Sequence, residues 1–221
     1  MNTRLLVFDW DGTLMDSEFH IVSCMKAAIC ELDLPDRKED EIKNIIGLGL
    51  MKAVQTLYPE QASEAFAHKL ADAYRSYYFS DDAPQQLFPG AVETLEHLID
   101  RGFLLAIATG KSRKGLDLSL EHTGLVEMFQ ISRCADETTS KPHPRMLNEI
   151  MTELACGQEE TIMIGDTEYD MEMAYNAGTK AIAVSYGVHE TQRLLKYKPA
   201  GCIDKITDLS GLLASFSDKS I

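Results

Sequence analysis

The chain has 221 residues, of which 45% are hydrophobic and 25% are charged, as in an ordinary soluble globular protein. This length can bury a full hydrophobic core, and it favours one domain with an insertion over a single minimal domain. The 21 basic and 35 acidic residues give a formal net charge of −14. A surface this negative repels nucleic acids and anionic membranes, so we expect neither as a partner.

The cysteines and the apolar segments indicate a cytoplasmic protein. The five cysteines are scattered and form no Cys-x-x-Cys pair, which argues against a disulfide framework and against a structural zinc site. No apolar run approaches the length of a membrane span, and the amino terminus lacks the pattern of a signal peptide. We expect a cytoplasmic monomer or weak homodimer.

The first predicted element is a β-strand over about residues 4–9, where an apolar run is rich in strand-forming residues. Asp9 and Asp11 end this strand, and side chains two apart on an extended chain point to the same side. Gly12 follows, and glycine tolerates the backbone conformations of a sharp turn. Open parallel sheets bind ligands beyond the carboxyl ends of their strands, so both carboxylates are expected to face one crevice. The motif alone leaves a solvated turn open as the alternative.

Residues 17–80 carry helical rather than strand-like patterns. Apolar residues recur at helical spacing in four segments, which predicts helices over 17–32, 41–46, 51–57 and a long stretch that begins after Pro59. Gly47 and Gly49 form a glycine-hinged turn between the second and third of these helices. We therefore expect an all-helical cap over 16–84.

From residue 85 onward, strand and helix patterns alternate. Strands are predicted over 103–108, 128–132, 161–164 and 180–184, and helices over 91–101, 112–122, 144–154 and 168–177, with a final helical turn over 206–214. Strands that are apolar throughout and separated by helices predict a parallel sheet covered on both faces. The fold class is therefore α/β, with a Rossmann-like parallel-sheet core of residues 1–15 and 85–221 and the helical cap inserted into it.

Further polar groups follow the later strands. Thr109 and Gly110 follow the strand that ends at residue 108, Lys141 lies between Ser140 and Pro142, and Asp166 and Asp170 follow the strand over 161–164. If the strands are parallel, all of these groups meet Asp9 and Asp11 at one edge of the sheet. The carboxylates outnumber the ammonium group, so an anionic ligand can approach only if a divalent cation neutralises them. Ligands that are all oxygen favour Mg²⁺ over zinc.

Each of these residues has a structural alternative. Thr109 can begin a helix as its N-cap, and Lys141 can be a solvated side chain. Asp166 can be a carboxylate favoured at a helix start, and Asp170 can close a capping box with Thr167. Because every motif lies just past an apolar strand, the set as a whole favours a site over four separate structural roles.

The segments Asp9-Trp10-Asp11-Gly12-Thr13, Thr109-Gly110, Lys141-Pro142 and Gly165–Asp170 resemble the four motifs of the haloacid dehalogenase superfamily of phosphotransferases. The resemblance covers the whole chain, including a helical cap after the first strand. The segment from Thr167 to Gly178 is similar to the phosphoglycolate phosphatase branch. The resemblance implies a Mg²⁺-dependent phosphomonoester hydrolase that acts on a small, phosphoglycolate-like metabolite.

The resemblance also implies a role for each residue. Asp9 attacks phosphorus and forms an aspartyl phosphate, Asp11 acts as general acid and then as general base, and Lys141 opposes the charge of the phosphate. The phosphate-binding groups are Gly12, Thr109, Gly110 and Lys141. The metal ligands are Asp9, the main-chain carbonyl of Asp11 and Asp166, with Asp170 acting behind them or through water.

Other functions remain as alternatives. A sugar-phosphate phosphatase or a phosphomutase uses the same fold, but the cap loop over 47–52 lacks the arginine of such mutases. This loop is apolar with one lysine, which favours a small ester with modest polar decoration. A receiver-like phospho-signalling protein or a non-catalytic protein fits less well, because the acceptor Asp9 lies on the first strand and all four motifs are intact. The second carboxylate, Asp11, argues against a dehalogenase.

Four more side chains near the motifs receive no catalytic role from the sequence. Trp10 departs from the small or aliphatic residue expected there, and we predict that it packs against a covering helix on the far face of the strand. Lys111 is close enough in the chain to line the entrance of the site, but nothing in the sequence assigns it a role. Lys52 and Arg75 are better explained as solvated side chains than as partners of a substrate carboxylate.

Overall fold

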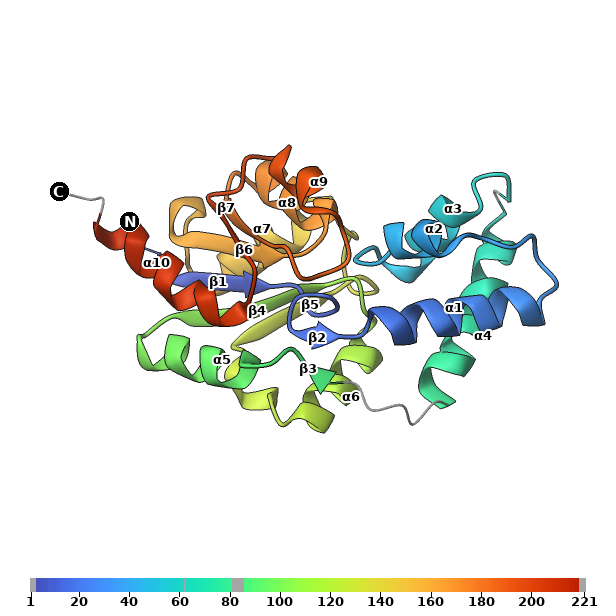
Figure 1. The fold of residues 1–221 in the computed structure, drawn as a ribbon, viewed down its shortest axis with the longest axis horizontal. Coiled ribbons are helices and arrows are strands. Elements are labelled where there is room, and N and C mark those ends of the chain that lie inside the picture. Colours follow the sequence, from blue (N-terminus) through green and yellow to red (C-terminus); the bar gives the residue numbers. More distant parts are fainter. Residues whose placement is uncertain (1–2, 62, 81–85, 219–221) are drawn as a thin grey trace.

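The structure, a computed structural model, describes residues 3–61, 63–80 and 86–218. Its centre is a parallel sheet with the strand order β5-β4-β1-β6-β7-β8 (Figure 1). These strands are β1 (Leu5–Phe8), β4 (Leu104–Thr109), β5 (Ile131–Cys134), β6 (Thr161–Gly165), β7 (Lys180–Val184) and β8 (Gly201–Ile203). The predicted α/β class with a parallel sheet is confirmed.

Strand β1 lies in the middle of the sheet, between β4 and β6. Its last residue, Phe8, pairs with Ile107 of β4 and with Ile164 of β6. Every residue of β1 is fully buried, as expected for a strand covered on both faces. The register brings the ends of three strands, and the residues that follow them, to the same edge.

Helices cover both faces of the sheet, and alternate residues of β1 point into two separate apolar clusters. Leu6 and Phe8 belong to the cluster under α5 (Ala91–Asp100), α6 (Arg113–Thr123) and α10 (Leu209–Asp218). Leu5 and Val7 belong to the cluster under α7 (Arg145–Glu153), α8 (Glu168–Ala177) and α9 (Thr191–Leu195). Figure 1 shows α5 and α6 on one side of the sheet and α7, α8 and α9 on the other.

The helical segment after β1 lies beyond the carboxyl end of that strand, at the right of Figure 1. It contains α1 (Glu18–Glu31), α2 (Glu39–Asn44), α3 (Leu50–Leu57) and α4 (Glu64–Ser80). These helices enclose an apolar cluster of their own, which includes Ile42, Val54 and Leu70. A short antiparallel pair, β2 (Met15–Asp16) and β3 (Gln86–Leu87), lies where the chain leaves and re-enters the sheet half.

Two sets of hydrogen bonds join the helical segment to the sheet half. The amide of Gly49 donates to Ser140 Oγ at 2.8 Å. Asn44, the last residue of α2, accepts at its carbonyl from Tyr169 Oη at 2.8 Å and at its side chain from Arg193 Nη2 at 2.7 Å. The helical segment is therefore fixed over the edge of the sheet where the predicted site residues lie.

The predicted elements agree with the structure to within a few residues, and the differences lie in its shortest pieces. The strand predicted over 128–132 begins later, at Ile131, because 126–128 form a 3₁₀ turn. The sequence patterns did not reveal β2, β3, β8 or α9. The other 3₁₀ turns are Gln158–Glu160 and Ile206–Asp208. The predicted boundary between cap and core at 84–85 lies outside the described residues.

Trp10 packs as predicted. Its side chain is fully buried, and its indole Nε1 donates to Ser119 Oγ on α6 at 2.9 Å. The ring of Phe129 meets the indole edge-on, with 6.3 Å between ring centroids. Trp10 thus anchors the strand end from the face opposite the carboxylates. In the part of the chain that the structure describes, no helix is long and apolar enough to cross a membrane.

Candidate active site

The structure brings the predicted site residues together at the carboxyl edge of the sheet. Asp9 follows β1, Thr109 ends β4 and Asp166 follows β6. The side chains of the set are buried although they are polar or charged: Asp9, Asp11, Thr109, Lys141, Asp166 and Asp170. Buried charges are rare without partners, so their mutual contacts define the site.

Lys141 forms the centre of the most buried charged group. Its ammonium lies 2.8 Å from Asp9 Oδ1 and 2.6 Å from Asp170 Oδ1, and none of these three side chains is more than 1% exposed. Burial disfavours the ammonium form, but the charges of Asp170 and Asp9 outweigh it and raise the pKa of Lys141. Lys141 is therefore charged and held between two carboxylates.

Asp9, Asp166 and Asp170 form a cluster that fits a divalent cation. One carboxylate oxygen from each lies within 4.8 Å of the others. Asp9 Oδ2 is buried and has no hydrogen-bond partner among the described residues. Three carboxylates face one ammonium, so the cluster carries excess negative charge. An ion with oxygen ligands would satisfy both the charge and the unpaired oxygen.

The pKa values of the carboxyl groups reflect the same excess of negative charge. Burial raises the pKa of Asp9 well above its usual range, and the charges of Asp170 and Asp166 add to this effect despite the opposing charge of Lys141. Burial and the charge of Asp170 raise the pKa of Asp166 to about 7. Without a cation, this cluster holds protons more tightly than ordinary carboxylates do.

Hydrogen bonds fix the carboxylate of Asp166. Thr13 Oγ1 donates to its Oδ1 at 2.7 Å, and the amide of Val188 donates to its Oδ2 at 2.9 Å. Gly12 passes directly beside it with φ at +81°, and a Cβ there would lie 2.2 Å from Asp166 Oδ2. Only glycine fits this backbone conformation and this close approach, so the first motif and the last depend on each other.

Asp170 has both of the roles considered for it from the sequence. Its Oδ2 accepts from the amide and from the hydroxyl of Thr167, at 3.0 and 2.7 Å, and the Thr167 hydroxyl accepts from the Asp170 amide. This is the capping box at the start of α8. Its other oxygen, Oδ1, faces Lys141. The helix cap therefore orients the carboxylate into the cluster.

Asp11 points away from the cluster, and sequence reasoning missed its main partner. Its Oδ1 accepts from Ser17 Oγ at 2.6 Å, and Lys111 Nζ lies 3.0 Å from both of its carboxylate oxygens. Lys111 also donates to the hydroxyl of Tyr78, on α4, at 2.6 Å. Burial opposes the charge of Lys111, but Asp11 outweighs it and raises the pKa of this lysine above its usual range. Its position two residues after Thr109, at a strand end, is the signal that could have revealed it.

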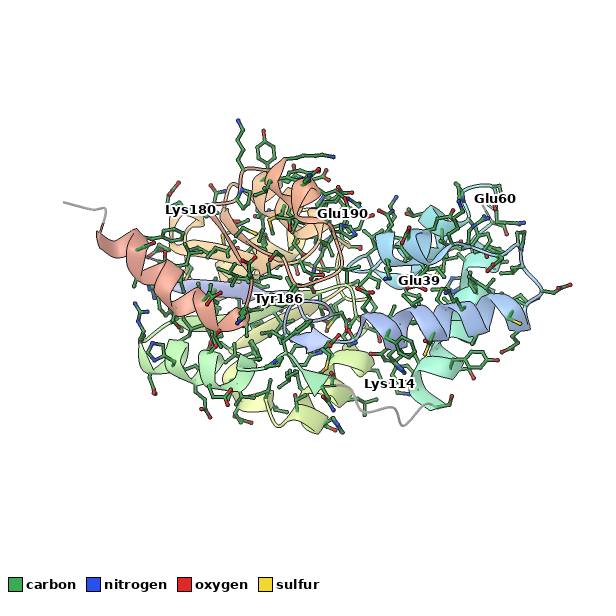
Figure 2. The ribbon with its side chains drawn as sticks, viewed as in Figure 1. Glu39, Glu60, Lys114, Lys180, Tyr186 and Glu190 are labelled. Atoms are coloured by element: carbon green, nitrogen blue, oxygen red, sulfur yellow. The ribbon has the colours of Figure 1, made fainter. Side chains whose placement is uncertain are left out.

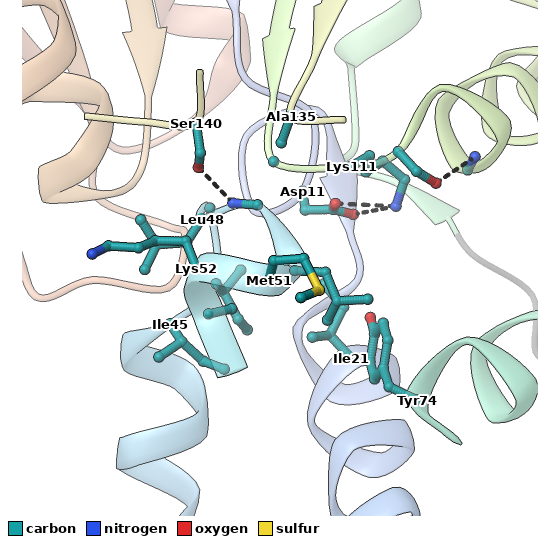
Figure 3. A pocket seen from close by; sticks show the side chains of 18 of the residues that line it. Asp11, Ile21, Ile45, Leu48, Met51, Lys52, Tyr74, Lys111, Ala135 and Ser140 are labelled. Carbon is teal, nitrogen blue, oxygen red and sulfur yellow. Dashed lines mark hydrogen bonds and ion pairs between the residues drawn. The ribbon is translucent and has the colours of Figure 1, made fainter. Parts of the chain in front are cut away.

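A cavity of about 370 Å³ opens beside these residues, between the sheet edge and the helical segment (Figure 3). Asp9, Asp11, Thr109, Gly110 and Lys111 line its sheet side. Thr109 Oγ1 already accepts from the amide of Lys111 at 3.2 Å. A ligand in this cavity therefore reaches the carboxylates of Asp9 and Asp11 together with backbone amides near Gly110.

Further contacts hold the two halves around this cavity. A Cβ at Gly110 would lie 2.6 Å from the carbonyl oxygen of Leu48 and 2.7 Å from that of Gly47, so the cap turn packs directly on this glycine. Within the sheet half itself, Tyr186, labelled in Figure 2, donates from its hydroxyl to the carbonyl of Thr13 at 2.8 Å and so supports the residue that bonds Asp166. The site is thus enclosed by backbone as well as by side chains.

Comparison with known proteins agrees with this geometry. Residues 6–184 match the family model of the haloacid dehalogenase-like hydrolases. The chain is 34% identical to the probable phosphatase IndB of Dickeya dadantii, over 94% of this chain and 92% of that protein. It is 26% identical to the pyrophosphatase PpaX of Anoxybacillus flavithermus, over 96% and 98% of the two chains.

A solved structure shows the same arrangement. The crystal structure of a "predicted phosphatase" from Clostridium acetobutylicum is 25% identical, with a TM-score of 0.86 over 97% of this chain and 100% of that one. The family match covers most of the chain, including the strands that deliver Asp9, Thr109 and Asp166. The chain belongs to the haloacid dehalogenase-like hydrolase family.

Proposed function

We propose that this hydrolase is a Mg²⁺-dependent phosphatase that cleaves the phosphomonoester of a small metabolite through an aspartyl phosphate on Asp9. The observation that carries the proposal is the buried cluster of Asp9, Asp166 and Asp170 around Lys141, at one end of a cavity. Relatives of the chain that are named phosphatase and pyrophosphatase support phosphoryl chemistry at this cluster.

Asp9 is the nucleophile in this proposal. Its Oδ1 accepts from the amide of Trp10 at 2.7 Å and lies 2.8 Å from Lys141, while Oδ2 has no hydrogen-bond partner among the residues described. Oδ2 can therefore form a bond to phosphorus while Oδ1 keeps the carboxylate in place. Such a fixed geometry lowers the entropic part of the barrier.

The main obstacle is charge, because a carboxylate must approach a dianionic phosphate. The Lys141 ammonium lowers this repulsion from the side of Asp9. We expect Thr109 and the amides near Gly110 to bind phosphate oxygens, whereas the amide of Gly12, also expected to do so from the sequence, already donates to the carbonyl of Met15 at 2.8 Å. Asp9, Asp166 and the main-chain carbonyl of Asp11 would hold Mg²⁺, with Asp170 behind them. When bound, Mg²⁺ supplies further neutralisation of the carboxylates and of the developing phosphoryl charge.

Asp11 is the general acid and then the general base in this proposal. An alkoxide is a poor leaving group, so Asp11 donates a proton to it and then accepts one from the water that attacks the aspartyl phosphate. In the structure both carboxylate oxygens of Asp11 face Lys111. These contacts fix the orientation of the carboxylate, and an oxygen of Asp11 that faces the leaving group must exchange its contact with Lys111 for one with the substrate.

The alternatives fit the site less well. A receiver-like protein fits less well, because Asp9 follows the first strand of the chain and a segment of four helices covers the site. A phosphomutase must also hold a second phosphate, and the loop over 47–52 has no arginine. A sugar-phosphate phosphatase of the same fold differs only in substrate, and the lining of the cavity bears on that question.

Turnover of p-nitrophenyl phosphate, with Mg²⁺ and with EDTA, tests the proposed function. We expect hydrolysis that stops with EDTA and returns with Mg²⁺. Asp9→Asn removes the nucleophile and should abolish turnover, while circular dichroism shows an unchanged fold. Metal-independent turnover, or activity of the Asp9→Asn variant within about tenfold of the parent, would contradict the proposal.

A further inference from the structure

Apolar side chains dominate the half of the cavity farthest from the sheet, although Lys52, Gln55 and Arg75 also line it. We call this part the apolar chamber and define it by Ile21 and Met25 of α1, Ile45 after α2, Leu50 and Met51 of α3, and Tyr74 of α4. Figure 3 shows Ile21, Ile45, Met51 and Tyr74 around one space, with Asp11 and Lys111 at its sheet end. The chamber is thus continuous with the site that holds the proposed nucleophile.

Among the described residues, the cations that line the cavity are Lys52, Arg75 and Lys111. Lys111 is paired with Asp11 and bonded to Tyr78. Arg75 forms an ion pair with Asp72 at 2.8 Å. Lys52 is exposed, and its ammonium points away from Asp11 in Figure 3. Of the described cations that line the cavity, Lys111 has a buried side chain paired with Asp11, whereas the side chains of Lys52 and Arg75 remain accessible to solvent. A second anionic group of a substrate would therefore find only solvent-accessible cations as partners.

The chamber also disfavours negative charge by its burial. Tyr74 has its pKa raised well above the usual range, mainly by burial and further by Tyr78 and Asp11. A carboxylate or second phosphate placed there would lose its hydration, and Lys111 at the sheet end is already paired with Asp11. A hydrocarbon part of a substrate would instead move from water into contact with apolar side chains, and this transfer lowers the free energy.

We propose that the substrate of this site is the phosphate monoester of an apolar alcohol, whose hydrocarbon part fills the apolar chamber while its phosphate lies at Asp9. This inference rests on the proposed phosphatase function. It differs from the phosphoglycolate-like substrate expected from the sequence, and from pyrophosphate, because both of those carry a second anion.

The reaction balances with the groups already described. Asp9 Oδ2 forms a bond to phosphorus as the ester P–O bond breaks, and Asp11 gives its proton to the departing alkoxide, which leaves as the alcohol. Water then attacks the phosphorus of the aspartyl phosphate and gives its proton to Asp11. This step releases inorganic phosphate and restores the carboxylate of Asp9. No oxidant or other co-reactant is needed.

A series of primary alkyl phosphates tests the inference with Mg²⁺ present. Methyl, ethyl, butyl and hexyl phosphate share the same kind of leaving group, so differences in kcat/KM report the contacts of the alkyl chain. We expect kcat/KM to rise by about fourfold for each methylene that the chamber buries. We also expect 2-phosphoglycolate and pyrophosphate to be hydrolysed with lower kcat/KM than hexyl phosphate.

A matched pair of variants separates the chamber from general effects. Met51→Gln makes the chamber wall polar at nearly constant volume and should reduce the ratio of hexyl to methyl phosphate kcat/KM by about tenfold. Met128→Gln places the same change on a half-buried methionine packed beneath the sheet, away from the cavity, and should leave that ratio unaltered. Equal ratios in the two variants would overturn the inference.

The outcomes for substrate and for function differ. If hydrolysis of all the alkyl esters is equally efficient, or if phosphoglycolate or pyrophosphate exceeds hexyl phosphate, the proposed phosphatase stands and the apolar substrate is wrong. Hydrolysis of none of these compounds, nor of p-nitrophenyl phosphate, would overturn the proposed function and this inference together.

Discussion

At the scale of single residues, the contact between Lys111 and Asp11 has a measurable consequence. Lys111 holds both oxygens of the proposed acid, and Lys111→Met should leave that carboxylate less well oriented. We expect kcat/KM for methyl phosphate to fall by about a hundredfold. The fall should be smaller for p-nitrophenyl phosphate, because its leaving group needs no proton.

Lys114 provides the matched control for this substitution. It is exposed on α6 and lies over the ring of Phe79, with Nζ 4.7 Å from the ring centroid. Lys114→Met should leave both substrates nearly unaffected. Equal losses for the two substrates in the Lys111 variant would show that this lysine does not act through Asp11.

The buried carboxylates also predict how Mg²⁺ and pH together affect stability. The pKa of Asp9 lies well above its usual range, and that of Asp166 is about 7. A carboxyl whose pKa is raised by folding stabilises the protonated protein, and this contribution is lost as the pH rises through the folded pKa. The contribution of Asp9 and Asp166 should therefore make the Tm of the metal-free protein lower at about pH 8 than at about pH 6.

Mg²⁺ should oppose this fall in Tm with rising pH, because the bound cation takes the place of the protons on the carboxyl groups. We expect the Mg²⁺-induced rise in Tm, measured by differential scanning fluorimetry, to be larger at about pH 8 than at about pH 6. Asp166→Asn removes one proposed ligand and should nearly eliminate the rise. A rise that is the same at both pH values would be evidence against metal binding at this cluster.

The sequence made most residues of this candidate site predictable, for a physical reason. Asp9 and Asp166 each follow a strand, and Thr109 ends one. The apolar runs of these strands are visible in the sequence, and parallel strands bring their ends to one edge. The partner of Asp11 was not predictable in the same way. The position of Lys111 just past Thr109 indicates the same sheet edge, but not which group its ammonium meets. That contact also involves Tyr78 from α4, and such a long-range contact leaves no pattern in the local sequence.

At the scale of elements, the turn between α2 and α3 depends on Gly110 of the sheet half. An added Cβ would lie within 2.6 Å of the Leu48 carbonyl, and this backbone atom cannot move without shifting the turn. Gly110→Ala should displace the turn from the site and lower kcat/KM for p-nitrophenyl phosphate by at least about tenfold, without unfolding the protein.

Gly211 allows a control for the Gly110 substitution. It lies within α10, where a Cβ would meet nothing within 4 Å, so Gly211→Ala should preserve activity and slightly raise stability. Activity of the Gly110 variant equal to that of the Gly211 variant would mean that the turn tolerates displacement. Circular dichroism of both variants checks that neither has unfolded.

The long elements could be predicted because their patterns repeat over several turns or along a whole strand. Helix α8 matches its predicted bounds, since Thr167 caps its start and Gly178 ends it in the left-handed conformation. By contrast, β8 has three residues and β2 and β3 have two each. Segments this short acquire strand geometry from their partners rather than from their own composition.

At the scale of the whole molecule, the candidate active site lies between the sheet half and the helical segment, each with its own packed side chains. The sheet half has an apolar cluster on each face, and the helices α1–α4 enclose a third. We continue to expect that residues 16–84 act as a cap on a core of residues 1–15 and 85–221. On this account the sheet edge supplies the phosphoryl chemistry, and the helices supply the contacts that select the rest of the substrate.

The central claim is that the carboxylate of Asp9 becomes phosphorylated during turnover. Acid quenching in the first turnovers with Mg²⁺ and p-nitrophenyl phosphate, followed by mass spectrometry of peptides, tests it directly. The account predicts the added mass of a phosphoryl group on the peptide that contains Asp9, and its loss in Asp9→Asn and with EDTA. Rapid turnover with a phosphoryl group on a different residue, or with none on any peptide, would contradict it.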